Sequence, residues 1–140
     1  MHPSRINGGK GLTVTALTDI LGTDRDVSGP GWNSRRLLLA SDGLGFSMTD
    51  TLIKKGAVLE LEYKHHMEAC YCIAGKGKIE HLNDGTIHQL KPFLLYALDK
   101  NDRHQVQAIG GDMRLVCVFN PPLTGQEVHC PDGSYEPDRA

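Results

Sequence analysis

The sequence predicts an all-β protein whose short antiparallel strands form a double sheet or a small barrel. From Trp32 onward, short apolar or alternating runs follow one another, and each ends in turn residues such as SDGLG, KKG, AGKG, NDG or IGGD. The runs are rich in β-branched and aromatic residues, and several alternate with a period of two, which is typical of half-buried strands. Helix is expected only around residues 16–21.

Each expected strand is bounded by one of these turns. The first four expected strands are RRLLLA (35–40), FSMTDTLI (46–53), VLELEY (58–63) and ACYCIA (69–74). SDGLG separates the first from the second, KKG the second from the third, and YKHH the third from the fourth, which ends at AGKG. The other five are KIEHL (78–82), TIHQL (86–90), LLYAL (94–98), HQVQA (104–108) and MRLVCVF (113–119). NDG separates the first two, LKPF comes before the third, DKNDR before the fourth and IGGD before the fifth, and a proline-rich tail follows the fifth. Their regular spacing favours two packed sheets or a barrel.

The chain has the length of one domain. With 140 residues and 15.3 kDa it is large enough to bury roughly 70% of the surface that its unfolded form exposes. We expect residues 1–11 (MHPSRINGGKG) to be a disordered or cloning-derived extension and residues 12–140 to form a single domain. Its Pro- and Gly-rich end, about residues 120–140, is expected to be a lid or a surface tail.

Charge and hydropathy favour a small-molecule partner. The formal net charge is −2 and both signs are interspersed, so neither nucleic acid nor an anionic membrane is an expected partner. The sequence has no apolar run near the roughly 20 residues of a spanning helix, and its start has no apolar core like that of a signal peptide. We therefore expect a cytoplasmic protein.

The cysteines are expected to be buried free thiols rather than disulfides. We expect Cys70 and Cys72 to face opposite ways on one strand, which argues against a bond between them, and Cys117 lies in another apolar strand. Because the sequence has no paired C-x-x-C spacing, a zinc site is not expected.

Three polar residues are the best metal-ligand candidates. Glu68, Tyr96 and His104 each lie at the end of an expected strand or in the turn beside it. Strands of a small barrel converge on one cavity, where a carboxylate, a phenolate and an imidazole would suit Fe(II) or a similar divalent metal and leave room for a substrate. On residue types alone, the alternative is that Tyr96 is a core tyrosine.

Two longer motifs resemble those of the cupins. In HHMEACYCIAGKG (65–77), Glu68 is followed after six residues by Gly75, as in the first cupin motif, and in KPFLLYALDKNDRH (91–104) a proline-centred turn leads to a histidine, as in the second. Four segments further resemble the ectoine synthases, and the similarity extends from about residue 12 to about residue 137: GWNSRRLLLASDGLGFSMT, YKHHMEACYC, YALDKNDRH and VCVFNPPLTGQEVHCPDGSY.

The resemblance implies a fold, a reaction and an assembly. Ectoine synthases are cytoplasmic, iron-dependent cupins, typically head-to-tail homodimers, that cyclise N-γ-acetyl-L-2,4-diaminobutyrate to the compatible solute ectoine with loss of water. A cupin-type β-barrel or jelly roll and a hydro-lyase of osmotic-stress metabolism are therefore implied, with Glu68, Tyr96 and His104 at the positions of the iron ligands. Strands at residues 35–40 and 113–119 are expected to offer unpaired edges for the dimer interface.

The resemblance also implies substrate contacts. Arg36 is expected to bind the substrate carboxylate, the alternative being a solvated strand-end arginine, and Trp32 either contacts the substrate or only closes one end of the barrel. The family's substrate-contact positions correspond to Trp32, Arg36, Thr51, Tyr63, Phe119, Glu127 and His129.

Four of the residues are candidates for a catalytic role. Glu127 and His129 are implied to transfer protons, the alternative being a polar turn in the tail. Tyr63 is a catalytic candidate as well as a substrate contact. His66 is expected to orient the site, whereas His65 is expected to lie on the surface.

Three residues depart from the family pattern and leave other functions open. Glu62 replaces a usual histidine, next to a second acid at Glu60, and is expected to point outward because Tyr63 beside it is the inward contact. Phe93 replaces a usual glycine, and since phenylalanine tolerates a positive φ poorly, its turn is expected to be built differently. The alternatives are a related enzyme acting on another small amide or amidine, and a non-catalytic small-molecule-binding cupin.

Overall fold

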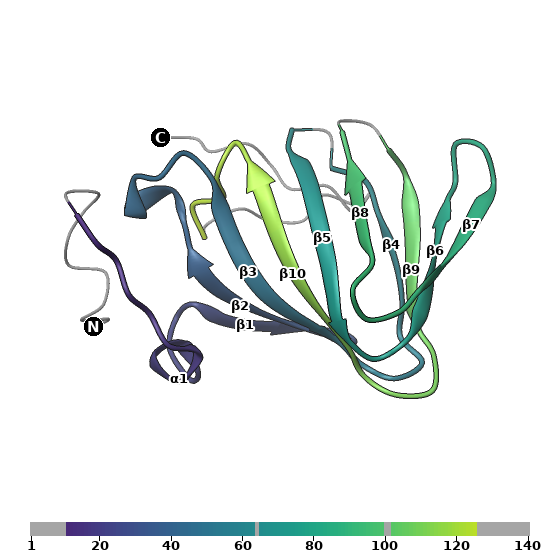
Figure 1. Cartoon of the computed structure of the whole chain (residues 1–140), viewed down its shortest axis with the longest axis horizontal. Coiled ribbons are helices and arrows are strands. Elements are labelled where there is room, and N and C mark those ends of the chain that lie inside the picture. The colour runs from purple at the N-terminus through teal and green to yellow at the C-terminus, as the bar shows by residue number, and fades with distance from the viewer. Residues whose placement is uncertain (1–10, 64, 100–101, 126–140) are drawn as a thin grey trace.

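Two antiparallel sheets make up the computed structural model, which describes residues 11–63, 65–99 and 102–125 (Figure 1). The six-stranded sheet contains, in spatial order, β1 (Asp26–Gly29), β2 (Trp32–Leu38), β3 (Ser47–Ile53), β10 (Met113–Asn120), β5 (Met67–Ala74) and β8 (Leu95–Leu98). The four-stranded sheet contains β4 (Val58–Leu61), β9 (His104–Ala108), β6 (Gly77–His81) and β7 (Thr86–Leu90). The predicted all-β class is confirmed, and every expected strand is present.

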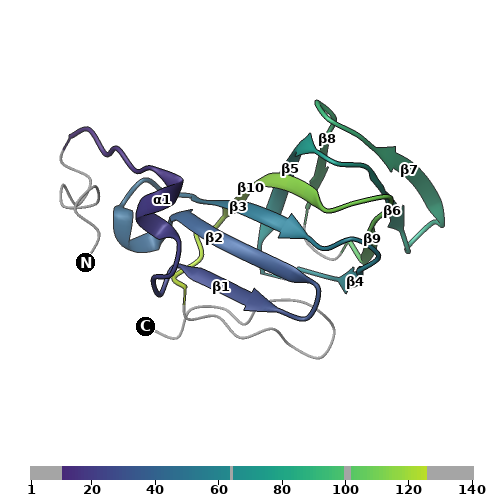
Figure 2. The ribbon, with the colours of Figure 1, turned by 90° about the horizontal axis from the view of Figure 1, so that it is seen from below.

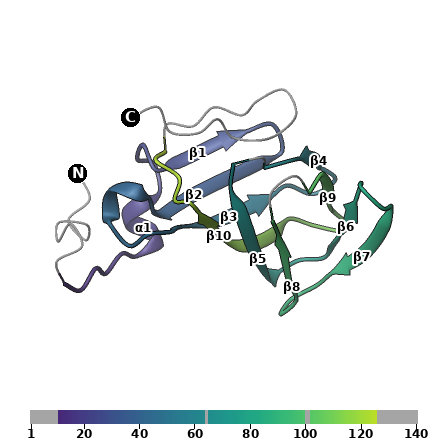
Figure 3. The same cartoon turned by 90° about the horizontal axis from the view of Figure 1, so that it is seen from above.

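The four-stranded sheet covers only part of the larger sheet. It lies beside β10, β5 and β8, whereas β1 and β2 extend away from it next to α1 (Figures 2 and 3). Apolar side chains from both sheets fill the space between them, among them Ile79, Val106, Met113 and Leu115. This half of the molecule is therefore the barrel that the strand pattern favours.

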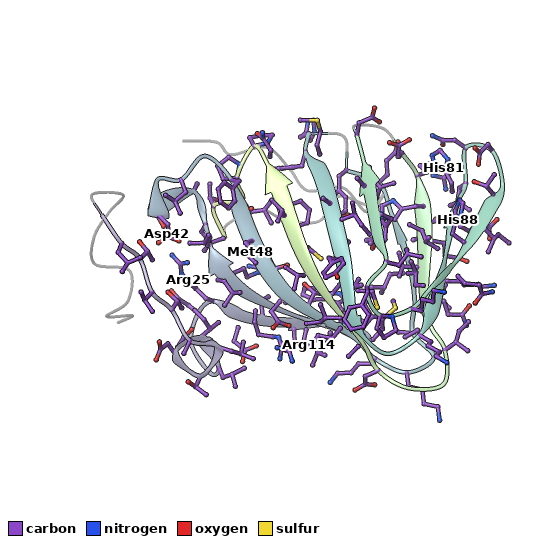
Figure 4. The ribbon with its side chains drawn as sticks, viewed as in Figure 1. Arg25, Asp42, Met48, His81, His88 and Arg114 are labelled. Carbon is purple, nitrogen blue, oxygen red and sulfur yellow. The ribbon has the colours of Figure 1, made fainter. Side chains whose placement is uncertain are left out.

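Among the described residues, helical structure is confined to residues 17–42. The helix α1 (Leu17–Ile20) confirms the expected segment, and a 3-10 turn, η2 (Ala40–Asp42), follows β2. Arg25 and Asp42 form a buried ion pair of 2.9 Å between Nη1 and Oδ2, which ties the segment before β1 to η2 (Figure 4). In the described part of the chain, no helix is long and apolar enough to cross a membrane.

One strand was not expected. The sequence DVSG of β1 has a single β-branched residue, so its own propensity is weak. A Pro30-Gly31 turn, with Gly31 at a φ of 79°, nevertheless returns the chain so that β1 pairs with β2. The prediction that the strands at residues 35–40 and 113–119 have unpaired edges is therefore wrong. The first belongs to β2, which pairs with both β1 and β3, and the second to β10, which pairs with both β3 and β5.

One row of side chains crosses the six-stranded sheet at the level of the site. Arg36 on β2 is opposite Thr49 on β3, which is opposite Cys117 on β10. Cys117 is in turn opposite Cys70 on β5, and Cys70 is opposite Tyr96 on β8. Five residues from separate parts of the sequence thus share one face of the sheet.

The three cysteines in the described part of the chain are free, as expected, but for a different reason. Cys70 and Cys72 do not face opposite ways, because residues two apart on a strand share a face, and both are buried with exposed fractions of 1% and 0%. Cys70, Cys72 and Cys117 are free thiols. Cys130 lies outside the described residues.

The turn at Phe93 corrects another expectation. Phe93 has a φ of 75°, so it adopts the left-handed conformation of the usual glycine instead of a rebuilt turn. Two backbone hydrogen bonds to β5 explain why: the Phe93 N–H donates to the Cys72 carbonyl (2.8 Å), and the Cys72 N–H donates to the Leu94 carbonyl (3.0 Å). They fix the turn, so Tyr96 keeps its place opposite Cys70.

The glycine of the first motif has a steric role. Gly75 has a φ of 80°, and a Cβ there would lie 2.2 Å from the carbonyl oxygen of Asp112. Only glycine permits both this conformation and this close approach of β5 to the chain before β10.

Candidate active site

A cavity of about 140 Å³ lies between the two sheets. Residues of all six-stranded-sheet strands except β1, of β4 and β9, and of the segment after β4 line it. Six of them are predicted site residues: Trp32, Thr51, Tyr63, Glu68, Tyr96 and Phe119. Its other walls are mainly small hydroxyl and apolar side chains, including Ser34, Thr49, Leu61, Val106 and Leu115. The volume is below the roughly 300–1,000 Å³ of pockets for drug-sized ligands, so the cavity suits a small metabolite.

Glu68 is a buried carboxylate in this cavity. It lies on β5 between Phe119 of β10 and Leu98 of β8, and its exposed fraction is 7%. Among the described residues, its Oε1 has no hydrogen-bond partner. Burial raises the pKa of Glu68 to about 7, from an ordinary value of 4.5. A bound cation would remove this cost of ionisation.

His104 is a fully buried imidazole on β9. Its Nδ1 lies 2.9 Å from the backbone carbonyl oxygen of Asp102, and because a carbonyl only accepts, Nδ1 carries the proton. Burial lowers the pKa of His104, so the ring is neutral and Nε2 keeps its lone pair. Among the described residues Nε2 has no hydrogen-bond partner, which is the arrangement of an imidazole prepared to bind a metal.

Tyr96 completes the predicted ligand set from β8. Burial, followed by the neighbouring Cys70 and Glu68, raises the pKa of its phenol well above the ordinary value. Tyr96 and Glu68 line the same cavity, and the His104 ring stands next to it, 6.0 Å from that of Tyr63 between centroids. Glu68 Oε1 and His104 Nε2 are buried and lack hydrogen-bond partners among the described residues, and Tyr96 lines the same cavity as Glu68. A carboxylate, an imidazole and a phenol are groups that bind a divalent cation.

Arg36 is not a solvated arginine. Its exposed fraction is 7%, and its Nε donates a hydrogen bond of 3.2 Å to the hydroxyl of Ser34, which lines the cavity. Among the described residues, no carboxylate forms an ion pair with it. A buried guanidinium beside a cavity suits an anionic ligand group.

Aromatic side chains form one wall. Tyr63 and Phe119 pack edge to face, with ring centroids 5.4 Å apart. The buried His66 also packs edge to face with Phe119, with ring centroids 6.3 Å apart, whereas His65 is exposed, as expected. Trp32 packs over Gly29, where a Cβ would lie 2.4 Å from the indole. Glu127 and His129 lie outside the described residues.

The two acidic departures differ in their relation to the cavity. Glu60 borders the cavity, but its carboxylate pairs with Arg103 at 3.3 Å, and both side chains are about half exposed. Glu62 is half-buried and is not among the described residues that line the cavity.

Cys70 and Cys117 lie next to Glu68, although neither is a predicted site residue. Their Sγ atoms and a carboxylate oxygen of Glu68 all lie within 4.8 Å of one another. The sequence does hold a signal for this, because residues two apart on a strand share a face. Cys70 follows Glu68 by two positions on β5, and Cys117 precedes Phe119 by two positions on β10.

A second, wider depression of about 380 Å³ lies beside β8, β6 and β7, and Tyr96 borders it as well. It contains His81 and His88, which lie on neighbouring strands (Figure 4). The His81 Nε2 lies 2.9 Å from a carboxylate oxygen of Asp102, the residue whose carbonyl holds His104. Asp102 therefore connects this depression to the candidate ligand.

Comparison with known proteins shows the family and the fold. The family described as ectoine synthase matches residues 12–139. The L-ectoine synthase of Desulfosudis oleivorans is 54% identical over 125 residues, covering 89% of this chain and 97% of that protein. The crystal structure of ectoine synthase from P. lautus has a TM-score of 0.78 at 49% identity and covers 81% of each chain. A cupin-2 domain protein of Rhodospirillum rubrum, 18% identical with a TM-score of 0.57, covers 64% of this chain and 60% of that one and shares the fold.

Proposed function

The chain belongs to the ectoine synthase family, and we propose that it is a hydro-lyase that cyclises N-γ-acetyl-L-2,4-diaminobutyrate to ectoine with loss of water. In this reaction the α-amine nitrogen bonds to the acetyl carbonyl carbon, the carbon–oxygen bond breaks, and the oxygen leaves as water. The observation that carries the proposal is the cavity itself. Six residues that the family resemblance implies as site residues line it, and among them is the buried Glu68, whose Oε1 has no hydrogen-bond partner among the described residues.

We propose that Glu68, Tyr96 and His104 hold an Fe(II) ion. When bound, such a cation supplies Lewis acidity, which makes the acetyl carbon more electrophilic. The neutral His104 and the carboxylate of Glu68 fit this role because their buried atoms Nε2 and Oε1 lack hydrogen-bond partners among the described residues. The backbone bond from Nδ1 to Asp102 holds the imidazole in the required tautomer.

The remaining residues would bind and fold the substrate. Arg36 is buried next to the cavity and would bind the substrate carboxylate, which fixes one end of the molecule. Tyr63, Phe119 and Trp32 form apolar walls that favour a folded substrate and exclude bulk water. Holding the amine near the carbonyl carbon removes much of the entropy cost of ring closure.

Proton transfer is proposed for the tail. The attacking amine must lose protons and the departing oxygen must gain them, which a carboxylate and an imidazole perform near neutral pH. Glu127 and His129 supply these two groups, and His66, packed behind Phe119, would keep the aromatic wall in place.

The family resemblance carries three further proposals: a head-to-tail homodimer, a cytoplasmic location and a role in osmotic stress. The assembly is tested by analytical ultracentrifugation of the full chain, where a single species of twice the monomer mass is expected and a monomer at all concentrations would contradict it.

The function is tested by product analysis. Full-length protein, loaded with Fe(II) without oxygen, is incubated with N-γ-acetyl-L-2,4-diaminobutyrate, and ectoine is measured by mass spectrometry. Wild type should form ectoine, and Glu68→Ala and Tyr96→Ala should not. Parallel reactions with other acylated diamino acids test the related-enzyme alternative. Substrate binding without any product would instead support a non-catalytic cupin.

A further inference from the structure

Two buried thiols that the proposed reaction does not use face each other at the site. Cys70 and Cys117 are opposite residues on β5 and β10, with Sγ atoms 3.3 Å apart and exposed fractions of 1% and 4%. Cys117 lines the cavity, and a carboxylate oxygen of Glu68 lies within 4.8 Å of both sulfurs. In Glu68, Oε1 has no hydrogen-bond partner among the described residues.

The spacing of these atoms is close to that of a metal site. Zinc bonds of about 2.3 Å to sulfur and about 2.1 Å to oxygen in a tetrahedron place two sulfurs about 3.8 Å apart and a sulfur and an oxygen about 3.6 Å apart. The sulfurs of Cys70 and Cys117 would therefore separate by roughly 0.5 Å, and the Glu68 oxygen would approach by at most roughly 1.2 Å. Side-chain rotations supply such changes.

We infer that Cys70, Cys117 and Glu68 form a binding site for a thiophilic divalent cation such as Zn(II) or Cd(II), overlapping the proposed Fe(II) site at Glu68. Each thiol would release its proton to solvent as its sulfur binds the cation. Two thiolates and one carboxylate would then carry three negative charges against the two positive charges of the cation. Tyr96 is opposite Cys70 on β8.

The two sites exclude each other because they share one carboxylate. Soft thiolates select Zn(II) and Cd(II), whereas the carboxylate, phenolate and imidazole of Glu68, Tyr96 and His104 suit Fe(II). A thiophilic cation held by Cys70 and Cys117 would therefore keep Fe(II) out and leave the cavity without its proposed function. This part of the inference rests on the proposed function, whereas the thiolate site itself does not.

Ultraviolet absorption tests the thiolate site directly. Reduced, metal-free full-length protein is titrated with Cd(II), and the sulfur-to-cadmium charge-transfer band is recorded. Wild type should develop the band with saturation at one equivalent, and Cys70→Ser and Cys117→Ser should lose most of it. Cys72→Ser is the matched control, because Cys72 is buried on the same strand but its Sγ faces the Ala74 carbonyl at 3.5 Å. Cys130→Ser is the second control, and both should keep the band.

Several outcomes would overturn the inference. One is a cadmium band of wild-type strength in Cys70→Ser and Cys117→Ser. Another is the absence of the band from the wild-type protein. A third is loss of the band in Cys72→Ser or Cys130→Ser. Melting curves identify unfolded variants, and Cys117→Ala then replaces Cys117→Ser. His104→Ala separates the two proposals, since it should keep the cadmium band while losing Fe(II) binding. The two assays use separate samples: a cadmium band in the titration, with no ectoine from cadmium-free protein loaded with Fe(II), refutes only the function. Ectoine from the Fe(II)-loaded sample, with no cadmium band in the titration, refutes only the thiolate site.

Discussion

The Nδ1 atom of His104 lies 2.9 Å from the carbonyl oxygen of Asp102, and this single contact determines which nitrogen of the buried imidazole is available. Since Nδ1 must donate, Nε2 presents a lone pair toward the interior. The carboxylate of the same Asp102 accepts from His81 at the surface, so the loop before β9 is held on both sides. The fold thus fixes the tautomer of a proposed metal ligand through main-chain geometry.

Replacing His104 by alanine should weaken Fe(II) binding by more than about 100-fold, since even groups that only support a ligand are worth about 10–100-fold. Calorimetric titration of metal-free protein without oxygen measures the change. His88→Ala, at an exposed position on β7, is the control and should bind as wild type does. Unchanged affinity in His104→Ala would remove His104 from the ligand set.

Glu68 should make the stability of the metal-free protein depend on pH. Its pKa rises on folding from 4.5 to about 7, so its stabilising contribution is complete below pH 4.5 and is lost as the pH rises through 7. The loss amounts to about 3 kcal/mol relative to Glu68→Gln. Urea unfolding of both proteins in chelator at pH 5 and pH 8 measures it. Parallel pH profiles for the two proteins would show that Glu68 ionises freely.

Phe93→Gly should stabilise the protein by about 1 kcal/mol. A non-glycine residue in the left-handed conformation costs about 1–3 kcal/mol, and part of this gain is offset because glycine loses more backbone entropy on folding. The Phe93 side chain is 77% exposed, so its removal sacrifices little packing. The melting temperature should rise by about 3 °C. Phe93→Ala keeps the strained backbone and should give no gain; an equal gain in both variants would locate the effect in the exposed ring.

Asp50→Asn should destabilise the protein by about 3 kcal/mol, because Asp50 joins β2 and β10 through Arg35 and Arg114 on the outer face of the large sheet. Burial alone would raise the pKa of Asp50, but hydrogen bonds from Arg114 and Arg35 hold it below 3.8. The contribution is therefore present at neutral pH and lost as the pH falls through the lowered value. Urea unfolding at pH 7 measures it.

An exposed ion pair offers the contrast. Glu60→Gln removes the pair with Arg103, whose side chain is 50% exposed, and should cost less than about 1 kcal/mol. Equal losses in Asp50→Asn and Glu60→Gln would contradict the importance of the buried network.

The sequence predicts where the strands lie better than it predicts which strands pair with one another. Alternation and turn residues indicate where β3 to β10 lie, because these signals are local. The strand β1 escaped prediction because the DVSG sequence is weakly β-forming and is held by pairing with β2. Without β1, the sequence pattern predicts β2 as an edge strand. The left-handed Phe93 was likewise missed because hydrogen bonds from β5 impose it.

In the candidate site, too, local sequence predicts some residues, whereas contacts between distant residues are seen only in the structure. Glu68 and Tyr96 could be selected by residue type and motif, and the cavity does bring them together. The tautomer of His104 depends on a contact with Asp102 that no pattern encodes. Cys70 and Cys117 are 47 residues apart in sequence and meet only through the β5–β10 register, so their proximity required the structure.

The most direct test of the proposed site is to measure bound Fe(II) and ectoine formation in parallel for wild type, Glu68→Ala, Tyr96→Ala, His104→Ala and the Cys72→Ser control. Wild type and Cys72→Ser should bind one equivalent and form ectoine, and the other three should lose both properties together. A variant without the His104 imidazole that binds one equivalent and forms ectoine at the wild-type rate would contradict the proposed site.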